Sequence, residues 1–276
     1  MNRYLLNNFL YEMDDEIFQN LLILFCKEAQ VRIEIKNKCF FNYYPQENQA
    51  LQLIVEGEDN EEKGVEIVDF FVHHTSSDIW KMKIIDKIKN SDNNSYMVSN
   101  ENGEGGYCIR FVNKEVLGDI NEGDIVEAQV VGLALNIDIY ENDEDYINNI
   151  EAGKDGSKNL LGEGQMFPLN LILNNSVDLS REEREKRNHT LDNIMTIKGT
   201  IKSANRLELN FANTKFNDYY LAIIDTAFGK LPIFFTQTML PKGIEGFGLG
   251  NVIVADILLS GDVCISEYDK YISKKK

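Results

Sequence analysis

The chain has 276 residues, 43% of them hydrophobic, and a formal net charge of −17 at pH 7. This length and composition predict about two globular domains and exclude disorder of the whole chain. The negative charge lies entirely in the first half, because residues 1–150 hold 12 Lys and Arg against 29 Asp and Glu, whereas residues 151–276 hold 16 of each.

The N-terminal segment, residues 1–79, is predicted as a helix packed on an antiparallel β-meander. Asp14 is expected to cap a helix whose apolar stripe runs from Ile17 to Phe25. Strict alternation of apolar and charged residues over 31–36 predicts the first strand of the sheet. Further strands are expected at 39–44, 51–55 and 65–74.

Residues 80–140 are predicted as a first β unit. It opens with a strand at 80–85, continues with two strands joined by the polar loop 99–106, and ends in a long strand over 123–139. The tract 141–165 that follows is acidic and rich in Gly and Asn, and few of its residues can offset the entropy lost on ordering. We therefore predict an acidic linker and a domain boundary there.

Residues 166–276 are predicted as a second β-rich domain. A capping box that begins at Ser180 predicts a short charged helix over 180–189. Gly199 lies in the middle of the next strand and predicts a bend or bulge there. The strands of this domain are expected at 167–173, 194–203, 219–225, 231–236 and 252–259.

Residues 250–266, GNVIVADILLSGDVCIS, echo residues 123–139, GDIVEAQVVGLALNIDI. Each stretch begins with Gly and a polar residue and runs through an apolar strand that holds one alanine, Ala128 or Ala255. In each half, a second apolar strand precedes this one at a similar distance. The echo is either an internal repeat or a coincidence of composition, and we interpret it as a tandem repeat of two related units.

In each half the order of elements is strand, bent strand, hairpin, connection and long strand. In this order, residues 80–140 and 194–268 each resemble the oligonucleotide/oligosaccharide-binding (OB) fold, a five-stranded Greek-key barrel. The resemblance implies a mainly β protein with tandem OB-like barrels, in which a ligand lies across strands two and three. The connection before Gly123 is short for the helix that usually closes such a barrel, so a simple antiparallel sheet is the alternative for the first half.

The resemblance directs attention to strands two and three of the second unit as a surface for nucleic acid. If Leu231, Ile233 and Phe235 face the core, Phe234 must face outward, where it could stack on a base while basic side chains contact phosphates. Packing in the core or at a sheet edge is the alternative role for any one of the aromatics. The candidate binding residues are Tyr219, Phe228, Phe234, Lys202, Arg206 and Lys230.

The sequence contains no recognisable catalytic or metal-binding motif. The adjacent His73 and His74 would point to opposite faces of a strand, and His189 has no ligating neighbour, so neither a metal nor a cofactor is predicted. The longest apolar run, Leu21 to Cys26, is too short to cross a bilayer, which favours a cytoplasmic protein without a membrane partner. Reduced thiols fit the same compartment, because no C-x-x-C spacing joins Cys26, Cys39, Cys108 and Cys264.

The one-sided charge is the basis of the functional prediction. A negative field repels phosphates and attracts basic surfaces, although it also keeps a protein soluble. We predict a non-enzymatic binding protein whose acidic first half docks on a basic protein, as an inhibitor, an immunity-type protein or an adaptor does. One alternative is an oligonucleotide-binding module in the second unit, where repulsion would make binding weak. The other is a hydrolase that uses dispersed carboxylates.

Overall fold

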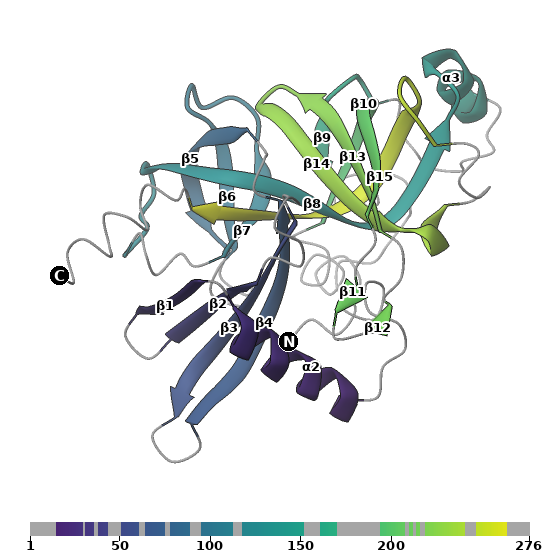
Figure 1. Ribbon diagram of the computed structural model, residues 1–276. Coiled ribbons are helices and arrows are strands. Elements are labelled where there is room, and N and C mark those ends of the chain that lie inside the picture. The colour runs from purple at the N-terminus through teal and green to yellow at the C-terminus, as the bar shows by residue number, and fades with distance from the viewer. Residues whose placement is uncertain are drawn as a thin grey trace, which may run out of the picture.

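The protein is mainly β, as the sequence predicts. A computed structural model describes residues 15–29, 31–35, 38–43, 51–60, 64–74, 78–88, 95–112, 118–151, 161–169, 194–207, 210–211, 214–215, 219–240 and 247–263. Two α-helices occur in these residues, and all other regular elements are strands or a single 3-10 turn. Figure 1 shows a large sheet that lies above a smaller N-terminal sheet.

The smaller sheet is an antiparallel meander covered by one helix. Helix α2 (Asp15–Glu28) begins one residue after the predicted cap, Asp14, which lies outside the described residues. Its side chains Leu22 and Phe25 are fully buried in a cluster with residues of the sheet. Phe25 lies on the predicted apolar stripe, whereas Leu22 is not among the residues predicted for it. The strands, in spatial order, are β1 (Val31–Ile35), β2 (Lys38–Tyr43), β3 (Leu51–Asn60) and β4 (Gly64–His74).

The large sheet contains strands from both halves of the chain. From the first half come β5 (Ile79–Lys87), β6 (Ser95–Asn100), β7 (Tyr107–Val112) and β8 (Ile125–Tyr140). From the second half come β9 (Met166–Pro168), β10 (Ile194–Leu207), β13 (Tyr219–Thr226), β14 (Gly229–Thr236) and β15 (Val252–Val263). The remaining elements are helix α3 (Asp143–Glu151), the turn η2 (Gln237–Met239), and the short pair β11 (Asn210–Phe211) and β12 (Thr214–Lys215).

A long antiparallel ribbon of β8 and β15 lies at the centre of the large sheet (Figure 1). The two strands pair from Val252 opposite Tyr140 to Val263 opposite Ala128. On one side, β5 pairs with β8 and β7 pairs in parallel with β15. The paired strands therefore form a closed ring, which we call ring 1 and which consists of β5, β6, β7, β15 and β8. On the other side, β10 pairs with β15 and β14 pairs in parallel with β8, so that β10, β13, β14, β8 and β15 close ring 2. The two halves are thus joined through their last strands, a connection that the sequence analysis did not predict.

The two rings correspond in detail. Gly123 and Gly250 both have a φ of 90°, a conformation that favours glycine. In ring 1, Gly123 N donates to Ile84 O over 2.9 Å, and Ile84 N donates over 2.9 Å to the carbonyl of the residue after the glycine. Gly250 and Ile201 make the same two bonds in ring 2, at 2.9 Å and 2.8 Å. The register against the next strand also slips directly after Ile84 in ring 1 and directly after Ile201 in ring 2.

The two rings are related by an approximate two-fold rotation about the β8–β15 ribbon. When the sequence echo is used to align the halves, Gly132 of β8 corresponds to Leu259 of β15, and these two residues lie opposite each other. The inward side chains of both rings belong to one hydrophobic cluster, which includes Trp80 and Met82 of β5 and Ile197 of β10. The large sheet therefore has a common core for both halves.

Part of the predicted acidic linker, residues 141–165, is helical, and this corrects the prediction for that part. Asp145 N donates to Asn142 Oδ1 over 2.9 Å at the start of α3. Tyr146 is fully buried in a cluster with Tyr140, Val252 and Val254. The composition of the tract concealed the helix, because its many polar residues surround a few apolar residues that cover the sheet. The helix predicted over 180–189 lies outside the described residues.

Candidate functional site

The surface predicted to bind nucleic acid on β13 and β14 is covered. Phe234 is 0% exposed, and Tyr219 is also buried. Phe234 does point away from the core of the rings, because its neighbours Ile233 and Phe235 belong to the core cluster and Phe234 does not. The prediction that Phe234 is exposed is wrong, since helix α2 and the smaller N-terminal sheet cover that face of ring 2. The residues that pack there with Phe234 and Tyr219 include Leu22, Phe25, Phe41, Val55 and Leu221.

Phe228 lies between the rings. The centroid of its phenyl group is 4.6 Å from the centroid of the Tyr107 phenol group and 5.6 Å from that of the Trp80 indole. Tyr107 and Trp80 both belong to ring 1 of the sheet. Trp80 Nε1 donates to Lys230 O over 3.2 Å, and Lys230 N donates to Asp78 Oδ2 over 3.1 Å. The hairpin between β13 and β14 is therefore fastened to ring 1, and Phe228 has the packing role that the sequence analysis gave as the alternative.

The three basic candidates are exposed, but they do not complete a binding surface with the aromatics. Lys202 Nζ lies 3.9 Å from Asp225 Oδ2, which partly neutralises it. Arg206 and Lys230 are also exposed. Since Tyr219 and Phe234 lie beneath α2, no predicted stacking residue on β13 or β14 is accessible beside these basic residues.

Burial affects two tyrosines in these clusters. It raises the pKa of the Tyr107 hydroxyl and the pKa of the Tyr219 hydroxyl above their ordinary range, because the charged phenolate would lose its hydration. Among the described residues, the Tyr107 hydroxyl has no hydrogen-bond partner. Both hydroxyls therefore stay protonated near neutral pH.

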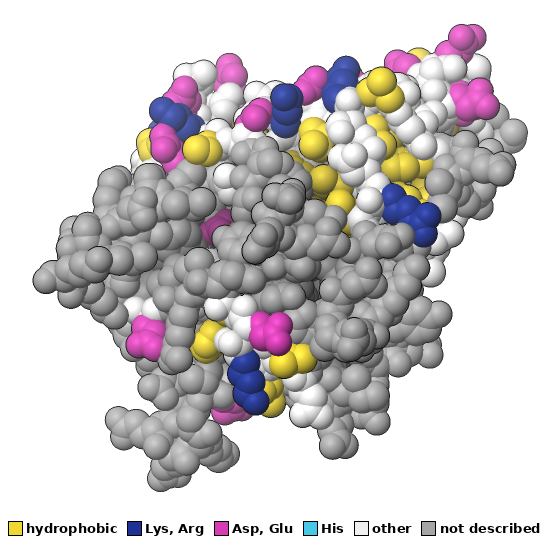
Figure 2. All heavy atoms as spheres, viewed as in Figure 1, with side chains coloured by type: hydrophobic (Ala, Val, Ile, Leu, Met, Phe, Trp, Pro, Cys, Tyr) yellow, Lys and Arg dark blue, Asp and Glu magenta, His cyan; other side chains and the backbone are white. Residues whose placement is uncertain are grey.

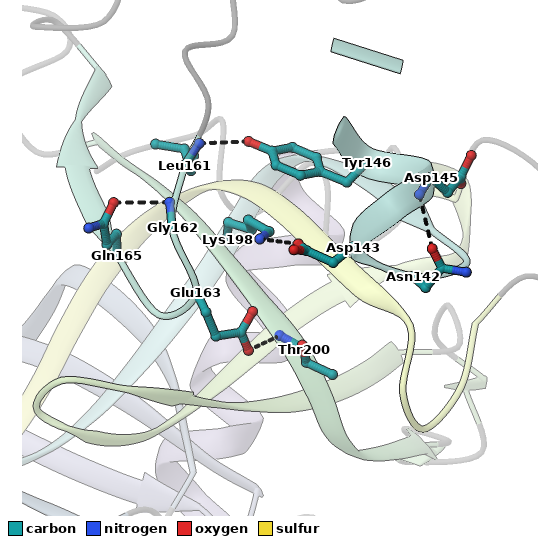
Figure 3. A network of polar contacts seen from close by, with 10 residues as sticks. All are labelled: Asn142, Asp143, Asp145, Tyr146, Leu161, Gly162, Glu163, Gln165, Lys198 and Thr200. Atoms are coloured by element: carbon teal, nitrogen blue, oxygen red, sulfur yellow. Dashed lines mark hydrogen bonds and ion pairs between the residues drawn. The ribbon is translucent and has the colours of Figure 1, made fainter. Parts of the chain in front are cut away.

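A buried lysine lies beneath helix α3 on the outer face of β10 (Figure 3). The Lys198 side chain is 4% exposed, and its Nζ forms an ion pair with Asp143. The same Nζ lies 4.8 Å from the centroid of the Tyr146 ring, a cation–π geometry. Tyr146 Oη accepts a hydrogen bond from Leu161 N over 2.8 Å. The ammonium is thus compensated by one carboxylate and one aromatic face.

The turn segment 161–165, which precedes β9, also covers the outer face of ring 2. Glu163 Oε1 accepts from Thr200 N over 2.7 Å, and Gly164 N donates to Lys198 O over 2.9 Å. Figure 3 shows these side chains converging from α3, from the segment and from β10. Asp143 and Tyr146 hold α3 against Lys198, while Glu163 and Gly164 hold the segment against β10, so we interpret Lys198 as a structural residue. In the sequence, Lys198 is only one polar residue in an alternating strand, and nothing there indicates its burial.

The corresponding face of ring 1 has no such cap among the described residues. Ile79 of β5 and Ile125 of β8 are each 53% exposed on this face. Lys81, which takes the place of Lys198, has a side chain that is 56% exposed, and its Nζ lies 3.3 Å from Glu127 Oε1. We call this surface, formed by Ile79, Lys81, Lys83, Ile125 and Glu127, the β5–β8 face.

In two loops of ring 1, every charged residue is acidic. Residues 101–106 and 118–124 contain no Lys, Arg or His, and all their acidic side chains are exposed. Within the described part of the chain, none of these carboxylates forms an ion pair, although Asp124 Oδ2 accepts from Asn121 N over 2.7 Å. Figure 2 shows acidic side chains along the upper edge of the molecule, over the large sheet, with Lys or Arg side chains between some of them. The acidic residues of the two loops are Glu101, Glu104, Asp119, Glu122 and Asp124.

The described residues contain no group of three or more His, Cys, Asp or Glu side chains that could hold a metal ion. His73 and His74 end strand β4, where they lie opposite Gln52 and Leu51. His189 lies outside the described residues. Within the same part of the chain, neither helix is long and apolar enough to cross a membrane.

The chain matches no protein-family model, no curated protein and no solved structure. A functional inference must therefore come from the surfaces described above. Of these, the acidic loops and the β5–β8 face are accessible, whereas the predicted aromatic surface on ring 2 is not.

Proposed function

We propose that the protein is a non-enzymatic binding protein whose acidic surface docks on a basic protein. The observation that supports this proposal is the uncompensated charge of the loops 101–106 and 118–124 in ring 1. Because no described cation neutralises these carboxylates, their field attracts a basic surface and steers its approach. The neutral second half adds no opposing charge, since it holds 16 basic and 16 acidic residues.

We also propose that the rings are two OB-like units that arose by duplication and share their last strands. The matching hydrogen bonds at Gly123 and Gly250 and the matching register slips support this inference. An oligonucleotide-binding function does not follow, because fold alone does not specify function. It is also disfavoured here, since the aromatic side chains Tyr219 and Phe234 are buried.

Charge reversal in the acidic loops tests the proposal. The full chain and a variant with Glu101→Lys, Glu104→Lys, Asp119→Lys and Glu122→Lys would be used as bait in untreated and in nuclease-treated lysate of the source cell, and bound proteins would be identified. We expect the full chain to retain a basic protein that high salt releases. The variant should bind this protein more weakly by a factor on the order of ten or more, because each reversed charge turns attraction into repulsion.

The control reverses two exposed carboxylates elsewhere, Glu28→Lys and Glu66→Lys, and should leave binding nearly unchanged. Losses of binding free energy in proportion to the number of reversed charges, four against two, would indicate an effect of net charge alone and would contradict a defined surface. Capture that disappears after nuclease treatment would instead favour the oligonucleotide-binding alternative.

A further inference from the structure

The β5–β8 face of ring 1 corresponds to a face of ring 2 that a helix covers. On ring 2, Val252 and Val254 are 1% and 2% exposed, because they pack with Tyr146 of α3. The sequence echo aligns Val252 with Ile125 of ring 1, which is 53% exposed. Among the described residues, ring 1 therefore presents an exposed aliphatic side chain at the place where ring 2 carries a helix.

The β5–β8 face offers side chains to a partner and no sheet edge. Strand β5 lies between β6 and β8, and β8 continues the sheet to β15 and β14, so both are interior strands of the large sheet. A partner that adds a strand needs an edge strand, whereas an amphipathic helix binds through its apolar side chains alone. Helix α3 on ring 2 is an example of the second kind of contact within this chain.

The acidic loop 118–124 lies at one end of this face. Gly123 N donates to Ile84 O over 2.9 Å, and Ile84 N donates to Asp124 O over 2.9 Å, which holds the loop beside the end of β5. Ile125 follows the loop directly in the chain. The exposed isoleucine therefore has uncompensated carboxylates next to it.

The acidic loop 101–106 lies at the other end of the face. Strand β6 runs antiparallel to β5 and ends at Asn100, so the chain continues from there toward the beginning of β5. Directly after the loop, the centroid of the Tyr107 phenol group is 6.0 Å from that of the Trp80 indole, near the start of β5. A segment that lies along β5 therefore meets carboxylates at both of its ends.

The charges between the two loops disfavour a uniformly basic segment. In the middle of the face, Lys81 Nζ lies 3.3 Å from Glu127 Oε1 and compensates it. Lys83 forms no ion pair with any described residue, so it repels a second cation. The segment that complements this surface is therefore basic at its two ends and apolar between them.

We propose that the basic partner docks through an amphipathic helix that spans the β5–β8 face from one acidic loop to the other. Aliphatic residues of this helix pack on Ile79 and Ile125, and its basic ends approach the loops. The four residues from Trp80 to Ile84 cover about 13 Å of strand, which a helix covers in about nine residues. Helix α3 has this length, 9 residues. The inference rests on the proposed function, because it names the part of the basic partner that binds.

Two labelled synthetic peptides test the inference by fluorescence anisotropy. One peptide is a helix of about 14 residues, which allows for the span of the face and about half a turn or more beyond each end, with leucines at helical spacing and lysines in its first and last turns. The other has the same residues in an order without an amphipathic pattern. We expect the full chain to bind the amphipathic peptide about tenfold or more tightly. The charge-reversal variant of the acidic loops should bind both peptides more weakly.

Substitutions on the face should remove this preference. We expect the pair Ile79→Thr and Ile125→Thr to abolish most of it, and the pair Ile79→Asp and Ile125→Asp to do the same. The aspartate pair is the sharper variant, because added negative charge would strengthen a purely electrostatic contact with a basic peptide. Unchanged hydrogen exchange in β10 and β13 shows that each variant is folded.

Leu249→Asp is the matched control for the aspartate pair. Leu249 is 77% exposed and precedes the part of β15 that pairs with Tyr140, at the opposite end of β8 from Ile125. This substitution also adds a negative charge, and it should leave the preference for the amphipathic peptide unchanged.

Equal affinity for the two peptides, lost on charge reversal, overturns the amphipathic helix and leaves the acidic surface as a binding site. A preference that survives both pairs of substitutions at positions 79 and 125 also overturns the inference, because the helix then binds elsewhere. Binding of neither peptide overturns it as well. The proposed function is decided separately, by the capture of a basic protein from lysate.

Discussion

Replacing Phe234 by alanine is expected to lower the free energy of unfolding by about 3–5 kcal/mol. Phe234 is fully buried between ring 2 and the N-terminal layer, where it packs in a cluster with Leu22 and Phe25 of α2. Removing the phenyl group leaves a cavity between ring 2 and the N-terminal layer, because close packing prevents the two from moving together to fill it. Urea denaturation followed by circular dichroism measures the change.

Phe167→Ala is the control for this prediction, because Phe167 is a partly exposed phenylalanine of β9 and should contribute much less, about 1 kcal/mol or below. The same variants separate packing from base stacking. If Phe234 stacked on a base, Phe234→Ala would weaken binding of single-stranded DNA or RNA by about 1–3 kcal/mol and leave stability almost unchanged. That result would contradict the buried position of Phe234.

Trp80→Ala is the second substitution with a large expected effect, a loss of about 3–5 kcal/mol in the free energy of unfolding. Trp80 is fully buried, contacts Phe228 of the other half, and donates its indole N–H to Lys230 O. The hairpin approaches the indole so closely that a Cβ at Gly229 would lie 3.2 Å from Trp80 Nε1. The substitution thus removes a contact that joins the two rings. Because Trp80 is the only tryptophan, its removal abolishes the tryptophan fluorescence signal, and unfolding must be followed by circular dichroism.

Trp80→Phe should keep most of the packing and lose only the hydrogen bond and part of the volume, with an effect of about 1–2 kcal/mol. Because the rings share a core, we expect Trp80→Ala to shift a single unfolding transition. Two separate transitions, of which only the earlier one moves, would contradict the shared core.

Periodicity predicted much of the fold. The alternation at 31–36, the long strands at 123–139 and 252–259, and the bend near Gly199 all correspond to strands or register slips in the structure. Alternation also gave the correct side of the sheet for Phe234. It could not show that this side is buried, because the residues that cover it, in α2 and β2, are far away in the sequence.

The sharing of the last strands could not be predicted from one half of the chain at a time. Each of β8 and β15 is long enough to serve two rings, but length alone does not specify a partner. Helix α3 was missed for a local reason, since Tyr146 and Ile147 are a short apolar signal in an acidic tract. The acidic surface, in contrast, follows from charge, and the loops of ring 1 are acidic in sequence and exposed in the structure.

Native-state hydrogen exchange of the full chain at increasing urea tests the central claim, that the β8–β15 ribbon makes the two rings one cooperative unit. We expect the amides of β8, β15, β5 and β10 to converge on one opening free energy, because neither ring closes without a strand of the other half. Opening of β10, β13 and β14 at a much lower free energy, while β5, β6 and β7 stay protected, would contradict it.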